Sequence, residues 1–138
     1  FPGIPALLHE LKADRVPMMV TTNTERNVAD AAISALGWQY FVDTICGDEV
    51  PAGKPAPDMY REAARRIGAK PADCLVFEDS ANGMRAAVDA GCVVIGLPED
   101  DEVEVPPEVT EVSQLRNSRH LAGARASEVY EWFSKISE

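Results

Sequence analysis

The sequence of 138 residues lacks several features, and each absence excludes a class of protein. No apolar run comes near the roughly 20 residues that a membrane-spanning helix requires, so a helical membrane span is excluded. Cysteine is scarce, and the three thiols of Cys46, Cys74 and Cys92 have no CxxC spacing. This excludes a disulfide scaffold and argues against a metal site or a nucleophile built on them. We expect all three to be buried core residues of a protein in a reducing compartment, the cytoplasm.

Bases are also few, since 13 Lys and Arg stand against 23 Asp and Glu and leave a net charge of −10. A surface of that sign repels phosphate backbones and anionic lipid, so neither nucleic acid nor a membrane is an expected partner. Seven of the acids, with no base among them, fall in the proline-containing stretch 98–111. We interpret this stretch as a solvated surface loop, which is favoured over the alternative of an acidic binding tail.

The sequence has no initiator methionine and no basic leader followed by an apolar run, and it opens with Phe1-Pro2-Gly3. We therefore expect residues 1–138 to be an internal piece of a longer protein. The hydrophobic content of 46% is typical of a globular domain, and the pattern contains no internal repeat and no second domain.

Apolar blocks of strand length alternate with segments of helical period along the chain. The blocks predict strands at 17–20, 41–46, 74–77 and 93–97. The spacing i, i+3, i+4, i+7 predicts helices around 7–11, 28–36, 60–67, 84–88 and 129–136. Ser127 is the expected N-cap of the last helix. Trp38 and Trp132 are either core or interface residues, and the core is the default expectation. This order predicts an α/β fold, a Rossmann-like open parallel sheet with helices on both faces.

In such sheets, ligands bind in the crevice beyond the carboxyl ends of the strands. Polar side chains follow three of the predicted strands: Thr21, Thr22 and Asn23, then Lys54, then the pair Glu78 and Asp79. Adjacent carboxylates at a partly desolvated sheet edge repel each other unless a cation lies with them, and Mg²⁺ binds carboxylate, water and phosphate oxygens. Hydroxyls and turn N–H groups cradle phosphate, and a lysine in a Gly-Lys-Pro-x-Pro turn supplies positive charge to it. The pattern therefore indicates a site for a phosphate with a divalent cation.

Each of these groups also has a structural alternative. Glu78 and Asp79 can lie at the N-terminus of the following helix, where negative charge is favourable without a metal. Lys54 can be a solvated loop residue, and the two threonines can form a helix cap or a turn. Each group taken alone leaves both interpretations open.

The order of hydroxyl, lysine and acid pair, with the runs 53–60 and 76–87, resembles the haloacid dehalogenase-like phosphohydrolase superfamily. Within it, the runs are similar to the branch that contains beta-phosphoglucomutase and the phosphoglycolate-type and sugar-phosphate phosphatases. The resemblance covers residues 2–97. It implies magnesium-dependent phosphoryl transfer on a small phosphorylated metabolite, and hydrolysis of a phosphomonoester is favoured over mutase chemistry.

The resemblance also implies a role for each candidate residue. Thr22, or alternatively Thr21, corresponds to the phosphate-binding hydroxyl, and Lys54 corresponds to the family's lysine. Glu78 and Asp79 correspond to the Mg²⁺-binding acids. Asn23 lies at the same strand end as the threonines, so it is placed with them at the phosphate.

The family's first motif, a strand ending in Asp-x-Asp, has no counterpart in this sequence. In the family, its first aspartate attacks phosphorus, its second protonates the leaving group, and the strand lies at the centre of the sheet. We therefore expect residues 1–138 to be an incomplete core domain, inactive alone, with the nucleophile and a substrate-selecting cap outside it. A contribution of the missing strand by another chain has no support in the sequence.

Two other function classes remain open at this point. A receiver-like regulatory domain also combines acids, a hydroxyl and a lysine, but receivers place the acids first and the lysine last, and here the lysine precedes the acids. A non-catalytic domain that binds phosphate or magnesium is compatible with the missing aspartates.

The sequence leaves the oligomeric state open, and a monomer is favoured.

Overall fold

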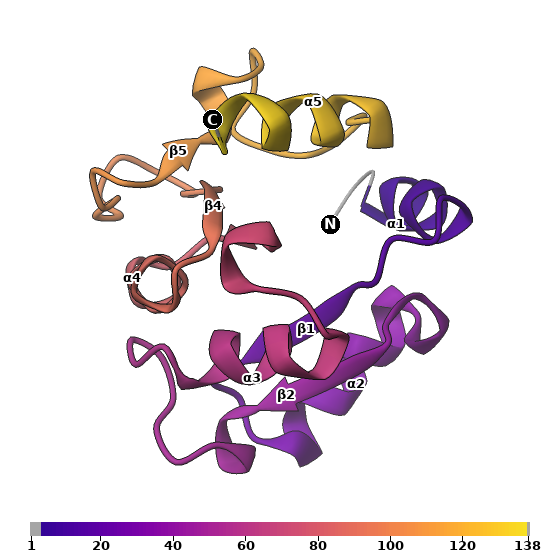
Figure 1. Cartoon of the computed structure of the whole chain (residues 1–138), viewed down its shortest axis with the longest axis vertical. Helices are drawn as coiled ribbons and strands as arrows, with labels where there is room; N and C mark the ends of the chain where they lie inside the picture. The colour runs from indigo at the N-terminus through magenta and orange to yellow at the C-terminus, as the bar shows by residue number, and fades with distance from the viewer. Residues whose placement is uncertain (1–3, 138) are drawn as a thin grey trace.

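The first half of the chain folds around a pair of short parallel strands (Figure 1). The computed structural model describes residues 4–137. Strand β1 (Met19–Thr22) pairs with β2 (Asp43–Cys46) along the full length of both strands. Helix α1 (Ile4–Ala13) precedes β1, and helix α2 (Arg26–Leu36) connects β1 to β2. This is the parallel crossover that the alternation of apolar blocks and helical spacing predicts.

The second half forms a sheet of three parallel strands. Strand β3 (Leu75–Glu78) pairs with β4 (Val93–Gly96), which pairs with the short β5 (Thr110–Glu111). Helix α3 (Asp58–Ile67) precedes β3, and helix α4 (Ala81–Ala90) connects β3 to β4. The parallel strands and intervening helices confirm the predicted α/β fold. Among the described residues, no helix is both long and apolar enough to cross a membrane.

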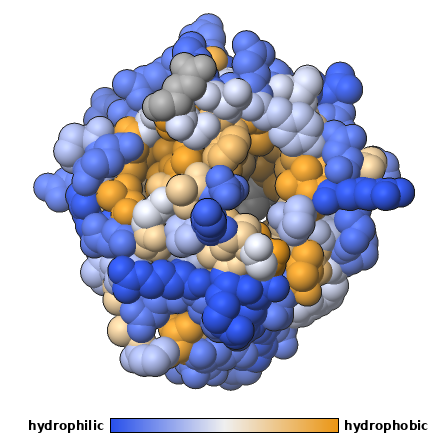
Figure 2. All heavy atoms as spheres, in the orientation of Figure 1, coloured by the Kyte–Doolittle hydropathy of each residue, from blue (hydrophilic) through white to orange (hydrophobic). Residues whose placement is uncertain are grey.

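The parallel strands lie in two separate sheets rather than in one. Strands β1 and β2 form one sheet and β3, β4 and β5 the other, and no strand pairing among residues 4–137 joins β1 to β3. Figure 1 shows the β1–β2 pair in the lower part of the molecule and β4 and β5 in the upper part. Between them, the space-filling view shows a hollow with apolar residues on its walls (Figure 2).

The last helix, α5 (Ala126–Ile136), packs against α1 at the opposite end of the chain. It begins two residues earlier than expected, and the prediction that Ser127 caps it is wrong, because Arg125 occupies the N-cap position. The carboxylate of Glu10 on α1 accepts the backbone N–H of Ala126 at 2.8 Å. A residue far away in sequence thus satisfies a helix N-terminus that local spacing alone would assign to a nearby serine.

Two expectations about the core are only partly confirmed. Trp132 is buried, whereas Trp38 is 44% exposed and donates its indole N–H to the Ser34 hydroxyl at 2.7 Å. Cys46 is buried, but Cys74 and Cys92 are half-buried, so the prediction of three buried thiols is wrong for these two. Both cysteines lie outside the strands, each directly before one, Cys74 before β3 and Cys92 before β4.

The acidic stretch 98–111 is largely the solvated loop that its charge indicates. The acids from Glu99 to Glu108 are exposed. The end of the stretch differs from the prediction, because Thr110–Glu111 form β5, with Val109 and Val112 buried on either side of it. These two valines supply the apolar surface that holds this edge strand against the core.

Candidate active site

A lysine lies where the carboxyl ends of β1 and β3 meet. The Lys54 ammonium donates to the backbone oxygen of Thr21, at the end of β1, over 3.1 Å. It also forms an ion pair with the Glu78 carboxylate, at the end of β3. The ammonium therefore bridges the ends of two strands that belong to different sheets. Three of the residues predicted from the sequence are thus brought together in space.

The loop that carries Lys54 is held in place by Asn23. The Asn23 side chain accepts the Lys54 backbone N–H at 2.8 Å and donates to the Lys54 carbonyl oxygen at 3.0 Å. A Cβ atom at Gly53 would lie 2.7 Å from the Asn23 side-chain oxygen, so this close approach requires glycine. The side chain of Asn23 is therefore engaged in fixing the lysine loop, and its backbone N–H is the group left for the predicted phosphate contact.

Thr22 closes the turn that follows β1. Its hydroxyl oxygen accepts the backbone N–H of Thr24 at 3.1 Å, and Gly47 donates its N–H to the Thr24 carbonyl at the same distance. A Cβ atom at Gly47 would overlap the Asn23 carbonyl oxygen, so the turn packs directly on a glycine at the end of β2. The Thr22 hydroxyl thus has the turn role that was its structural alternative, and its O–H proton is still available as a donor.

Glu78 is a buried carboxylate with several partners. Its side chain is 7% exposed and that of Lys54 is 8% exposed, so the ion pair lies away from bulk water. The Tyr60 hydroxyl donates to the same carboxylate oxygen that pairs with Lys54, and the Ser80 hydroxyl lies 3.5 Å from the other oxygen. Burial, and then the neighbouring Glu78 charge, raise the pKa of Tyr60, which keeps this phenol a hydrogen-bond donor at neutral pH.

The first turn of α4 makes room for this carboxylate. A Cβ atom at Gly83 would overlap the Glu78 carboxylate oxygens, so only a glycine fits there. Ser80 caps the helix by accepting the Gly83 N–H at 3.0 Å. The acid is therefore enclosed by a helix N-terminus, a lysine and a phenol, all of which favour negative charge.

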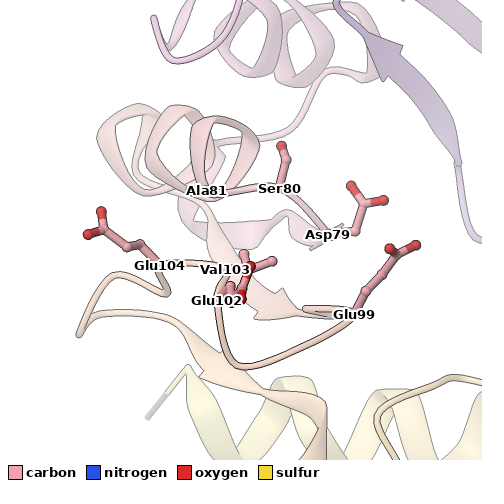
Figure 3. Close-up of a pocket in the computed structure, with 7 residues that line it drawn as sticks. All are labelled: Asp79, Ser80, Ala81, Glu99, Glu102, Val103 and Glu104. Carbon is pink, nitrogen blue, oxygen red and sulfur yellow. The ribbon is translucent and has the colours of Figure 1, made fainter.

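Asp79 is placed differently from its neighbour Glu78. Its carboxylate is exposed, has no hydrogen-bond or ion-pair partner among the described residues, and lines a cavity of about 460 Å³ with Ser80 and three glutamates of the acidic stretch (Figure 3). In this view Asp79 and Glu99 lie at one end of the cavity and Glu104 at the other. The structure therefore does not bring the two adjacent acids together, since one is paired with Lys54 and the other faces solvent.

The Asp79 carboxylate can bind a magnesium ion only together with further oxygen ligands. Among residues 4–137, no three His, Cys, Asp or Glu side chains are grouped closely enough to hold a metal ion. Mg²⁺ commonly takes one or two protein carboxylates and completes its shell with water and phosphate oxygens, so an exposed carboxylate without a partner suits it. Glu78, with both oxygens occupied, is the weaker candidate ligand of the two.

Sequence reasoning missed Tyr60 as a site residue. Its position on the buried side of α3 fits the helical spacing of core residues, and its hydroxyl is the only sign of another role. A tyrosine at a core position of a helix indicates that its hydroxyl needs a hydrogen-bond partner, and this much can be inferred from the sequence. Which residue is the partner depends on how α3 packs against the end of β3.

Comparison with known proteins identifies the family of the chain. Residues 1–91 match the model of the haloacid dehalogenase-like hydrolases. Over 99 residues the chain is 43% identical to the bifunctional riboflavin kinase/FMN phosphatase of Arabidopsis thaliana, which covers 70% of this chain and 26% of that protein.

Two solved structures extend the likeness to three dimensions. A protein of Thermotoga maritima, provisionally described as a beta-phosphoglucomutase, is 33% identical with a TM-score of 0.66, over 70% of this chain and 45% of that one. CbbY from Rhodobacter sphaeroides, in complex with phosphate, is 29% identical with a TM-score of 0.79, over 94% of this chain and 58% of that one. The chain spans less than half the length of the curated relatives it matches first, 26% of one and 46% of the next. From the family match and these likenesses, we conclude that the chain belongs to the haloacid dehalogenase-like hydrolases.

Proposed function

We propose that the intact protein hydrolyses a small phosphomonoester in a magnesium-dependent reaction. The observation that carries this proposal is the Lys54 ammonium, held between the ends of β1 and β3 by Thr21 and Glu78. A fixed positive charge at the carboxyl end of a parallel sheet is placed to stabilise the charge that develops on a transferring phosphoryl group. Relatives of the chain include phosphatases that act on FMN and on fructose 1-phosphate.

The residues of this chain divide the work of binding and charge stabilisation. The Thr22 hydroxyl and the backbone N–H groups of the turn at Asn23 donate to phosphate oxygens, with Thr21 at the base of the turn. Lys54 neutralises negative charge on the phosphoryl oxygens. When bound, Mg²⁺ supplies further neutralisation of that charge, and Asp79 is the residue of this chain that would hold it. We assign Glu78 to holding Lys54, which narrows the prediction that both acids bind the metal.

The nucleophile is proposed to come from a strand outside residues 1–138. Thr21 and Glu78 mark the carboxyl ends of β1 and β3, and both contact the Lys54 ammonium. A strand that paired with both β1 and β3, and ran in their direction, would satisfy their facing backbone groups and end beside this ammonium. An aspartate there would attack phosphorus as the bond to the leaving alcohol breaks, and water would then release phosphate from the aspartyl-phosphate.

The setting of this activity is also a proposal. The substrate is a small phosphorylated metabolite, selected by a cap outside residues 1–138, which are themselves the family's core domain without its first strand. Three free cysteines are consistent with a reducing cytoplasm. We expect a monomer that uses no nucleic acid or membrane partner.

The test is phosphate release by the intact protein from p-nitrophenyl phosphate and a panel of sugar phosphates. We expect release with Mg²⁺ and none with excess chelator. Asp79→Asn is expected to lower the rate by at least about 100-fold, because loss of even an outer-shell partner of a metal ligand costs about 10–100-fold and Asp79 would hold the metal directly. Glu104→Gln is the matched control, because Glu104 lines the same cavity and loses the same charge, and it is expected to keep the wild-type rate.

Two outcomes would contradict the proposal. One is the absence of phosphate release from every phosphomonoester tested, and the other is an Asp79→Asn variant as active as the wild type. Isomerisation of a phosphosugar without net release of phosphate would identify a mutase in place of a phosphatase.

A further inference from the structure

Tyr60 is a buried side chain beside the site, and no step of the proposed function uses it. The residue is 7% exposed and packs from α3 into a core cluster with Val76 and Met84. Its hydroxyl donates to the Glu78 oxygen that also pairs with Lys54. The Lys54 ammonium lies 5.0 Å from the centre of the Tyr60 ring, within the range of a cation–π contact. One aromatic side chain thus contacts both members of the buried ion pair.

The ion pair itself has few rigid supports. A lysine side chain is a flexible stem that carries a compact charge, so the ammonium stays in one place only if its partners are fixed. Of the other donors to Glu78, the Ser80 hydroxyl is at 3.5 Å, the limit of a hydrogen bond. Tyr60 has two side-chain torsions, and its ring is held by the core. The phenol is therefore the firmest anchor of the carboxylate among the described residues.

We propose that Tyr60 is a positioning residue for phosphoryl transfer. Its hydroxyl fixes the Glu78 carboxylate, which in turn holds the Lys54 ammonium at the ends of β1 and β3. Tyr60 itself touches no substrate. This inference rests on the proposed function for its catalytic consequence, and its structural content stands on the contacts alone.

The first test is the kinetics of Tyr60→Phe in the intact protein. Phenylalanine keeps the ring, its packing and its contact with the ammonium, and removes only the hydroxyl. Misplacement of a catalytic group by about 1 Å costs up to about 100-fold in rate, and we expect a fall of about 10-fold in kcat with little change in KM. The matched control is Tyr130→Phe, since the Tyr130 hydroxyl also donates to a carboxylate, that of Asp14 at 2.7 Å, at the remote contact of α5 with α1. We expect it to leave both kcat and KM unchanged.

A second background separates positioning from a general loss of structure. In a Lys54→Met protein there is no ammonium to position, so Tyr60→Phe is expected to have no further effect on the remaining kcat. If Tyr60→Phe lowers kcat equally in both backgrounds, or in neither, the proposal is overturned.

A crystal structure of the intact Tyr60→Phe protein decides the structural content without any activity. We expect the Glu78 carboxylate to rotate and the Lys54 ammonium to leave its hydrogen bond with the Thr21 carbonyl. If both groups stay where they are, Tyr60 does not position them and the proposal fails. Should the wild-type protein release no phosphate, the proposed function fails alone, and this structure still decides whether Tyr60 fixes the ion pair.

Discussion

Removing one partner of the Lys54–Glu78 pair tests whether the ion pair is truly desolvated. The change Lys54→Met keeps most of the aliphatic side chain and deletes the charge, which leaves a carboxylate that is 7% exposed with only hydroxyl donors. Loss of one partner of a buried ion pair costs about 3–5 kcal/mol, because the remaining charge has no compensation. The hydroxyls of Tyr60 and Ser80 remain, so we expect the lower end, about 3 kcal/mol. The double variant Lys54→Met/Glu78→Gln removes the orphaned charge and is expected to regain about 2 kcal/mol of this.

The assay is urea unfolding of the intact protein at pH 7, followed by tryptophan fluorescence and circular dichroism. Arg65→Met is the matched control, because Arg65 pairs with Glu62 on the surface of α3 and its side chain is 73% exposed. We expect this control to have the wild-type midpoint, since exposed pairs contribute little. The reasoning is refuted if Lys54→Met is as stable as the control, or if the double variant is less stable than Lys54→Met.

Three other changes test the packing and charge around the site. Gly83→Ala places a methyl group against the buried Glu78 carboxylate, and it is expected to lower the free energy of unfolding by about 1–3 kcal/mol in the same assay. An unchanged midpoint would show that the first turn of α4 moves to accommodate the methyl group. Trp132→Ala is expected to lower the free energy of unfolding by about 3–5 kcal/mol, because the ring is buried between α1 and α5. Trp38→Ala, at an exposed site, is expected to leave it nearly unchanged. Equal effects of the two variants would contradict the difference in burial. A hydrogen bond from Arg26 is the main cause that lowers the pKa of Glu49, so this acid stabilises the fold above its unfolded pKa and the contribution is lost as the pH falls through the lowered folded value. Glu49→Gln should therefore flatten the acid limb of the stability profile and leave its shape above neutral pH unchanged, and an unaltered acid limb would count against this.

The order of helices and strands was predictable because it depends on local apolar spacing. The strand at Val93 and the helix ended by Gly91 follow from an apolar block and a glycine, and both are confirmed. The failures depend on distant contacts. The start of α5 is set by Glu10, more than a hundred residues earlier, and β5 forms because Val112 is buried against the core. Neither the Glu10–Ala126 contact nor the burial of Val112 can be predicted from the spacing of nearby residues.

The candidate site was predictable as a set of residues but not as a geometry. Lys54 and Glu78 follow from their places after predicted strands, and the structure brings them together, with Glu78 as the last residue of β3. Adjacency in sequence suggested that Glu78 and Asp79 act as a pair, whereas neighbours along an extended chain point to opposite sides. The direction of the Glu78 side chain is fixed by Gly83 and Tyr60, which the sequence presents only as helix residues.

The burial of the lysine bears on which function class the site suits. A charge held in a site that excludes water acts more strongly on charge developing beside it than an exposed charge does. Lys54 is 8% exposed, and it contacts the ends of two strands that do not pair with each other. This charge therefore lies at the junction of the two sheets. The proposed strand between β1 and β3 would end at that point, so the same strand would complete both the sheet and the site in the covalent phosphoryl transfer that we propose.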